Sequence, residues 1–225
     1  MPRPLRHRRR SGSSRPSKPS RTEKTTVLIV CEGQKTEYHY FCQLKQEACV
    51  KKGFRVTVKP GKGGSRQQVA QLAVQCKERA DDLYDAVWCV MDVEHPEGLP
   101  AMREALAYLK GKEILPALSN PAFEVWLLAH FERTGAVFAD CSAVVKRLDK
   151  HWHQQFRAAY DKADERIYRW LADRVEQAIA NAEWVRKHHH SGKDAIDSNS
   201  STEVDLLVGS PRNEGMLCRR SGSAI

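Results

Sequence analysis

The sequence predicts an α/β protein with a core of about four mainly parallel strands, flanking helices and a C-terminal helical extension. Two observations support this: short apolar runs rich in β-branched residues alternate with segments whose apolar residues recur every three or four positions. The predicted strands cover residues 25–31, 54–59, 85–91 and 113–118, with helices over 36–50, 65–81 and 97–110. Since this alternation builds parallel sheets through right-handed crossovers, ligand-binding residues are expected at the carboxyl ends of the strands.

The composition divides the chain into four expected segments. They are a disordered basic arm (1–24), an α/β core (25–135), a helical extension packed on the core (136–208) and a disordered tail (209–225). The extension is expected because an apolar stripe runs at helical spacing from Ile167 to Val185. Within it, STEVDLLV (201–208) is predicted to form a short last helix.

The positive charge is concentrated at the N-terminus. Residues 1–24 hold nine Lys or Arg residues against one acid, so they carry +8 of the net charge of +9. Such an arm is expected to contact nucleic acid through Arg8, Arg9 and Arg10, although a solubilising tail would have the same composition. The remaining chain is close to neutral.

Cysteine usage and hydropathy indicate a cytoplasmic protein that does not enter a membrane. The seven cysteines are scattered and form no C-x-x-C pair, which favours a reducing compartment and small buried side chains over disulfides or a metal site. No apolar run approaches the length of about 18 residues that a membrane span needs. The basic N-terminus lacks the apolar segment of a secretory signal.

Acidic residues follow two of the predicted strands. Glu32 comes directly after the first strand, and Asp92 and Glu94 follow the third. In a parallel sheet these three carboxylates meet at one edge, where their mutual repulsion is relieved by a divalent cation. Each acid taken alone also fits a solvated loop or a helix cap, but together they predict a site for Mg²⁺ or Mn²⁺ that positions a phosphate.

Further polar residues are expected near the same edge. Lys35 could meet a phosphate at a helix N-terminus and Glu37 could order Lys35 or a metal-bound water, or both could lie in a solvated first turn. Asn120 is expected to cap a helix with Pro121 at its first position, and Glu124 to lie in the first turn near the positive end of the helix dipole. Either could also serve as an extra ligand of a metal or water.

Histidines and a glycine-rich loop give weaker signals. His95 and His130 are candidates for proton transfer, with a structural role as the alternative. The run 188–190 indicates no more than adventitious metal binding. The spacing around Lys62 does not fit a P-loop, so no ATP site is predicted in this chain.

The arrangement of Glu32-Gly33 after the first strand and Asp92-x-Glu94 after the third resembles a Toprim domain, the metal-binding catalytic module of topoisomerases, bacterial primases and OLD-type nucleases. In that family a Glu-Gly pair ends the first strand and a D-x-D ends the third. Glu94 stands where a second Asp is usual, which keeps the charge on an arm longer by one methylene.

Longer motifs are similar to the RloB family of small Toprim-like proteins from phage-defence loci. The similarity covers about residues 24–208 and departs from the family at DSNSS, where Asn-Pro is usual. The motifs are VCEGQKTEYHYF (30–41), VWCVMDVEH (87–95), SNPAFEVWLLAHF (119–131), AAYDKAD (158–164) and STEVDLLV (201–208).

This resemblance implies a Mg²⁺-dependent nuclease of phage defence that works with an AAA- or ABC-type ATPase partner. Glu32, Asp92 and Glu94 would hold the metal, and Lys35 would stabilise charge developing on the phosphate. The alternative is a non-catalytic sensor or adaptor that binds a metal or nucleotide within an ATPase-containing complex. The choice between DNA and RNA stays open, as does assembly into a homo-oligomer.

Overall fold

The structure is a computed structural model, and it describes residues 24–51, 54–80, 83–94 and 98–209. The predicted basic arm, including Arg8, Arg9 and Arg10, lies outside the described residues, as do His95 and the expected tail from residue 210. The strands are β1 (Thr25–Cys31), β2 (Phe54–Lys59), β3 (Ala86–Asp92), β4 (Leu115–Asn120) and β5 (Ser201–Thr202). The helices are α1 (Thr36–Lys51), α2 (Arg66–Glu78), α3 (Leu99–Gly111), α4 (Glu124–Ala129), α5 (Cys141–Phe156), α6 (Ile167–Leu171), α7 (Val175–His189) and α8 (Val204–Gly209).

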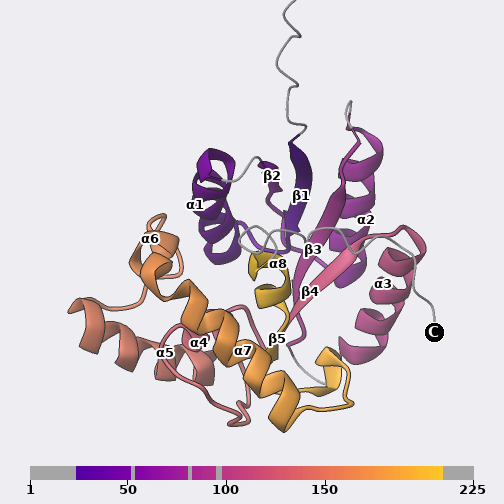
Figure 1. Cartoon of the computed structure of the whole chain (residues 1–225). Helices are drawn as coiled ribbons and strands as arrows, with labels where there is room; N and C mark the ends of the chain where they lie inside the picture. Colours follow the sequence, from indigo (N-terminus) through magenta and orange to yellow (C-terminus); the bar gives the residue numbers. More distant parts are fainter. Residues whose placement is uncertain (1–23, 52–53, 81–82, 95–97, 210–225) are drawn as a thin grey trace, which may run out of the picture.

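The five strands form one sheet in the order β2-β1-β3-β4-β5. The first four run parallel, and β5 joins β4 antiparallel. The predicted α/β class and its mainly parallel core are therefore confirmed. The parallel strands place all four of their carboxyl ends along one edge of the sheet, which lies at the lower side of the sheet in Figure 1.

Each face of the sheet carries its own helical layer (Figure 1). Successive side chains of a strand point to opposite faces, so Leu28 and Val30 pack with α2 and α3, whereas Val27 and Ile29 pack with α1 and the helices from α4 onward. All four side chains are buried, which explains why β1 is apolar without interruption rather than alternating. The second layer joins the predicted core and the predicted helical extension through one continuous set of apolar contacts.

Local signals explain several helix boundaries. Ser65 caps α2 as expected, since its hydroxyl accepts from the Gln68 amide and the Gln68 side chain accepts from the Ser65 amide. The predicted cap by Asn120 is wrong: Asn120 continues β4, and its side-chain amide donates to the carbonyls of Ala195 and Ile196. α4 begins at Glu124, so Pro121 is not its first residue.

The C-terminal segment differs from the expectation in one respect. Ser201 and Thr202 form β5 rather than the start of a helix, and α8 begins at Val204. The Thr202 hydroxyl hydrogen-bonds that of Ser119 at 2.9 Å, which fixes the strand against β4. A two-residue polar strand has no periodicity of its own, so its partner strand decides its conformation.

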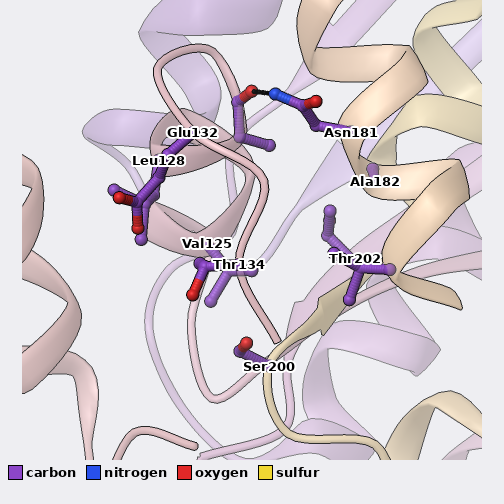
Figure 2. Close-up of a pocket in the computed structure, with 10 residues that line it drawn as sticks. Val125, Leu128, Glu132, Thr134, Asn181, Ala182, Ser200 and Thr202 are labelled. Atoms are coloured by element: carbon purple, nitrogen blue, oxygen red, sulfur yellow. Dashed lines mark hydrogen bonds between the residues drawn. The ribbon is translucent and has the colours of Figure 1, made fainter. Parts of the chain in front are cut away.

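None of the helices in the described part of the chain combines the length and the apolar character that crossing a membrane requires. A small cavity lies between α4, α7 and β5, as Figure 2 shows, where the Asn181 side chain donates to the carbonyl of Ala129. Its volume of about 20 Å³ is close to that of a single water-sized probe, so it is too small to admit a substrate.

Candidate active site at the carboxyl edge

The neighbouring strands β1 and β3 bring Glu32 and Asp92 together. Cys31 pairs with Val90, and the Glu32 amide donates to the Val90 carbonyl at 3.0 Å. This register places the Glu32 side chain beside the last residue of β3, where its Oε2 accepts a hydrogen bond from the Asp92 amide at 2.9 Å. The predicted convergence of these two residues at one edge is therefore present.

Gly33 makes room for Glu37, the second residue of α1. A Cβ added at Gly33 would lie 2.8 Å from Oε2 of Glu37, so this carboxylate lies directly over the backbone of residue 33. Burial raises the pKa of Glu37, as do the charges of Glu124 and Glu32, against the opposing hydrogen bond from its own amide. Glu37 therefore belongs to the same acidic cluster as Glu32.

Asp92 lies at the centre of this cluster. Its pKa is raised well above the usual value, first by burial and then by the charges of Glu37, Glu124, Glu32 and Glu94. The pKa of Glu32 is also raised, mainly by burial, although the hydrogen bond from Asp92 and the nearby Arg66 oppose the shift. Crowded acids of this kind are characteristic of functional sites, because folding alone does not favour them.

Glu124 is the most deeply buried of these acids, with 3% of its surface exposed. The Lys162 ammonium lies 2.9 Å from its Oε1, and the Tyr160 hydroxyl donates to the same oxygen at 3.3 Å. The Cys141 thiol donates to Oε2 at 3.4 Å. A buried carboxylate needs such partners, since an unpaired charge in the interior is strongly unfavourable.

Glu124 also shifts the pKa of these three partners. Burial lowers the pKa of Lys162, but the hydrogen bond and charge of Glu124 outweigh it and the net shift is upward, so Lys162 stays cationic. Burial and then Glu124 raise the pKa of Cys141 to about 11, so the thiol stays protonated. Lys162 and Tyr160 are not among the site residues that the sequence predicts, although both lie in AAYDKAD, one of the motifs that carry the family resemblance.

Glu94 is directed elsewhere. Its backbone has a φ of 55°, and its carboxylate forms an ion pair with Arg66 at 3.2 Å. Arg66 also donates to the Val93 carbonyl at 2.8 Å and packs against Gly98, where a Cβ would lie 2.6 Å from its Nη1. Arg66 thus holds the turn after β3, a role that the sequence reasoning did not assign to it.

The other candidates lie in different surroundings. Lys35 is exposed one turn before His39, and only its backbone carbonyl makes a hydrogen bond in the described structure. His130 is fully buried, with Nδ1 2.9 Å from the Trp126 carbonyl and its ring packed against Trp126 and Tyr40. The structural alternative for His130 therefore has direct support.

The donor set fits a hard divalent cation, because all the clustered groups are carboxylates. In the described residues, however, no three His, Cys, Asp or Glu side chains are already arranged around one metal position. Glu32 instead faces the Asp92 amide, Glu94 faces Arg66 and Glu124 faces Lys162. The residues best placed to hold a cation are Asp92, Glu32 and Glu37. The charges of Glu32 and Glu37 raise the pKa of Asp92, and the charge of Glu32 raises the pKa of Glu37.

Comparisons with known proteins bear on the family but not on the chemistry. No curated protein and no solved structure matches the chain. The family of RloB-like proteins matches residues 27–210, which include β1 from Val27 onward, the other four strands of the sheet and the acidic cluster. Because the match spans most of the 225 residues, the chain belongs to the RloB-like family.

Proposed function

We propose that the protein is a Toprim-type, Mg²⁺-dependent phosphodiesterase that cleaves nucleic acid. The observation that carries the proposal is the position of Asp92, whose pKa is raised by burial and by four neighbouring carboxylates at the carboxyl edge of the sheet. Ligands of open parallel sheets bind at this edge. A divalent cation, Mg²⁺ or Mn²⁺, would offset the repulsion between the acids and supply Lewis-acid chemistry at a phosphate.

In this proposal each residue has a distinct task. Asp92, Glu32 and Glu37 would hold the cation, and Glu94 would be available as a further ligand if its ion pair with Arg66 opened. The raised pKa of Glu32 also suits it to proton transfer as a general acid or base. Lys35, which is exposed just before α1, would contact the phosphate from solvent.

Lys162 and Tyr160 support the site without touching the cation. By pairing with Glu124 they hold this buried carboxylate in place and limit its repulsion of Asp92. Asn120 stays a structural residue in this scheme, because its side chain is used to bind the loop at 195–196.

The biological setting proposed here rests on the family. Cleavage of nucleic acid would serve phage defence in the cytoplasm, with an AAA- or ABC-type ATPase as partner. The basic arm at residues 1–24, outside the described residues, would add salt-dependent affinity for the substrate.

The direct test is cleavage of single- and double-stranded DNA and of RNA by the full-length protein, with Mg²⁺, Mn²⁺ or EDTA. Asp92→Asn and Glu37→Gln should lose cleavage, whereas Asp173→Asn, a change at an exposed acid after α6, should not. If the wild type cleaves no better than Asp92→Asn, with and without a partner ATPase, the nuclease proposal is wrong.

A second candidate function is favoured by the pairing of Glu94 with Arg66 and by the lack of a ready-made metal position in the described residues. The protein would then be a sensor or adaptor that binds a metal or nucleotide and changes the activity of its ATPase. In that case ATP hydrolysis by the partner would depend on Asp92, while no nucleic acid would be cleaved.

A further inference from the structure

A second cavity, separate from the acidic cluster, lies at the end of α7. It is lined by the last turn of that helix, the loop at residues 190–198 and the edge strand β5. Its volume is about 300 Å³, large enough for several polyatomic groups. The lining residues are Arg186, Lys187, His190, Ser191, Gly192, Lys193, Ala195, Ser198, Ser201 and Glu203.

Two of the lining residues have unused hydrogen-bonding atoms. Both ring nitrogens of His190 are buried and find no partner in the described residues, and the same holds for the Ser201 hydroxyl. Ser201 is 2% exposed. Since Thr202 uses its hydroxyl on Ser119, the alternation of β5 turns Ser201 to the other side, toward the cavity. Buried polar atoms are rarely left without partners, so these atoms point to a ligand.

The charge of the lining is mainly positive. Arg186 is bound to Asp205 and to the Thr202 carbonyl, so it serves to anchor α7 to β5 and α8. Lys187 pairs with Glu183 one turn back, and both are exposed. Lys193 is exposed and forms no ion pair with any described residue.

A turn at Gly192 brings the backbone of Lys193 back to that of His190. The Lys193 amide donates to the His190 carbonyl at 3.0 Å, and Gly192 between them has a φ of 77°, which a side chain would rarely adopt. The acid in the lining, Glu203, is directed away, because its Oε2 accepts from the Leu118 amide at 3.2 Å. The wall of the cavity therefore holds unpartnered donors beside a free cation, and the side chains of His190 and Ser201 would have to turn toward an oxyanion for the donors to reach it.

We propose that this cavity is a subsite for a phosphate group of a nucleic-acid strand, bound by His190, Ser201 and Lys193. The assignment to nucleic acid rests on the proposed function. The position of the cavity is consistent with that function. β5 lies two strands from β3, and adjacent strands are about 4.8 Å apart, so the subsite lies about 10 Å or more to the side of Asp92. A nucleic-acid strand that lies along this edge of the sheet would span this distance with roughly three nucleotides, at the rise they have in a duplex.

The test is binding without cleavage, followed at the histidine itself. Full-length protein labelled with ¹⁵N-histidine would be titrated in EDTA with a single-stranded oligonucleotide and, separately, with inorganic phosphate. His190→Asn identifies the His190 ring resonances. We expect them to shift saturably with the oligonucleotide, and Lys193→Ala to weaken this binding about tenfold, as loss of one charge-assisted contact would. Lys146→Ala, at an exposed lysine of α5, should leave it unchanged.

Each other outcome overturns a defined part of the proposal. If His190 responds to phosphate but not to the oligonucleotide, the ligand is a small phosphate compound and the assignment to nucleic acid is wrong. No response to either ligand means that the cavity is no anion site. Because EDTA suppresses cleavage, a response at His190 stands even if the nuclease proposal fails, and cleavage that depends on Asp92 stands even if His190 is silent.

Discussion

Oε2 of Glu32 accepts a hydrogen bond from the backbone amide of Asp92 at 2.9 Å. The side chain at the end of β1 thus holds the backbone at the end of β3, and a residue proposed for chemistry also has a structural task. Substitutions at position 32 must separate the two tasks, and the choice between glutamine and alanine does so.

Glu32→Gln keeps an oxygen that can accept from the Asp92 amide but removes the negative charge. We expect a folded protein with a thermal stability at least that of the wild type, because a buried charge is removed, and cleavage reduced about 100-fold, as for loss of a general acid or base. Glu32→Ala leaves the amide unpaired and should also lower the free energy of unfolding by about 1–3 kcal/mol. Urea denaturation and cleavage assays measure the two effects, and equal stability of the two variants would show that the hydrogen bond contributes nothing.

Divalent metal should stabilise the protein through Asp92. Binding to the native state alone adds about 2.7 kcal/mol at a metal concentration 100 times the dissociation constant, which corresponds to a rise in melting temperature of several degrees. Without metal, Asp92→Asn should melt higher than the wild type, because it removes a buried charge from among like charges. With Mg²⁺ its melting temperature should not rise. Asp173→Asn, the control, should behave as the wild type, and an equal metal response in Asp92→Asn would place the metal elsewhere.

Lys162 and Glu124 should be energetically coupled. Lys162→Ala leaves the buried carboxylate of Glu124 without its cation and is expected to destabilise the protein by about 1–3 kcal/mol. This is less than for a fully buried ion pair, because half of the lysine side chain is exposed. Adding Glu124→Gln should recover part of that loss, so a double-mutant cycle by urea denaturation should give a coupling above about 0.5 kcal/mol. Lys150→Ala, at an exposed lysine of α5, provides the control, and additive effects would contradict the pairing.

Gly61 should not tolerate a side chain. A Cβ there would lie 2.0 Å from the carbonyl oxygen of Glu32 and 2.7 Å from that of Cys31, both in the backbone that carries the site. Gly61→Ala is therefore expected to lower the free energy of unfolding by about 1–3 kcal/mol or more. It should also reduce cleavage, because it displaces Glu32. The matched control is Gly111→Ala at the end of α3, where a Cβ meets nothing within 4 Å. A Gly61→Ala protein as stable and active as Gly111→Ala would refute the close approach.

Asp164 should contribute stability that disappears in acid. Its carboxylate accepts hydrogen bonds from Arg166 and from the Trp170 indole, and first the Arg166 bonds lower its pKa to about 2. A folded-state pKa below the unfolded value of about 3.9 means that the contribution is complete above pH 4 and is lost as the pH falls toward 2. Urea midpoints of the wild type and Asp164→Asn should therefore differ at pH 7 and converge below pH 4. A difference that persists at pH 2 would rule out this linkage.

The positions of Glu32 and Asp92 could be predicted from the sequence because they depend on short-range patterns. Each follows an uninterrupted apolar strand, and the alternation of strands and helices makes those strands parallel, so their ends share an edge. The Ser65 cap and the buried stripe from Ile167 to Val185 are equally local. The stripe is nevertheless divided between α6 and α7 by a 3-10 turn at Ala172–Arg174, which periodicity alone does not reveal.

Contacts between distant segments were decided by the tertiary structure. Lys162 pairs with Glu124, and Arg66 pairs with Glu94. The two polar residues of β5 pair with β4 at the edge of the sheet. None of these pairs leaves a periodic signal, because each depends on how loops cross the edge of the sheet. The sequence by itself therefore determined the fold class and the edge at which the acids gather, since apolar burial follows local spacing. The partner of each acid was determined only by the tertiary structure, because the groups that surround a buried charge come from segments that are distant in the sequence.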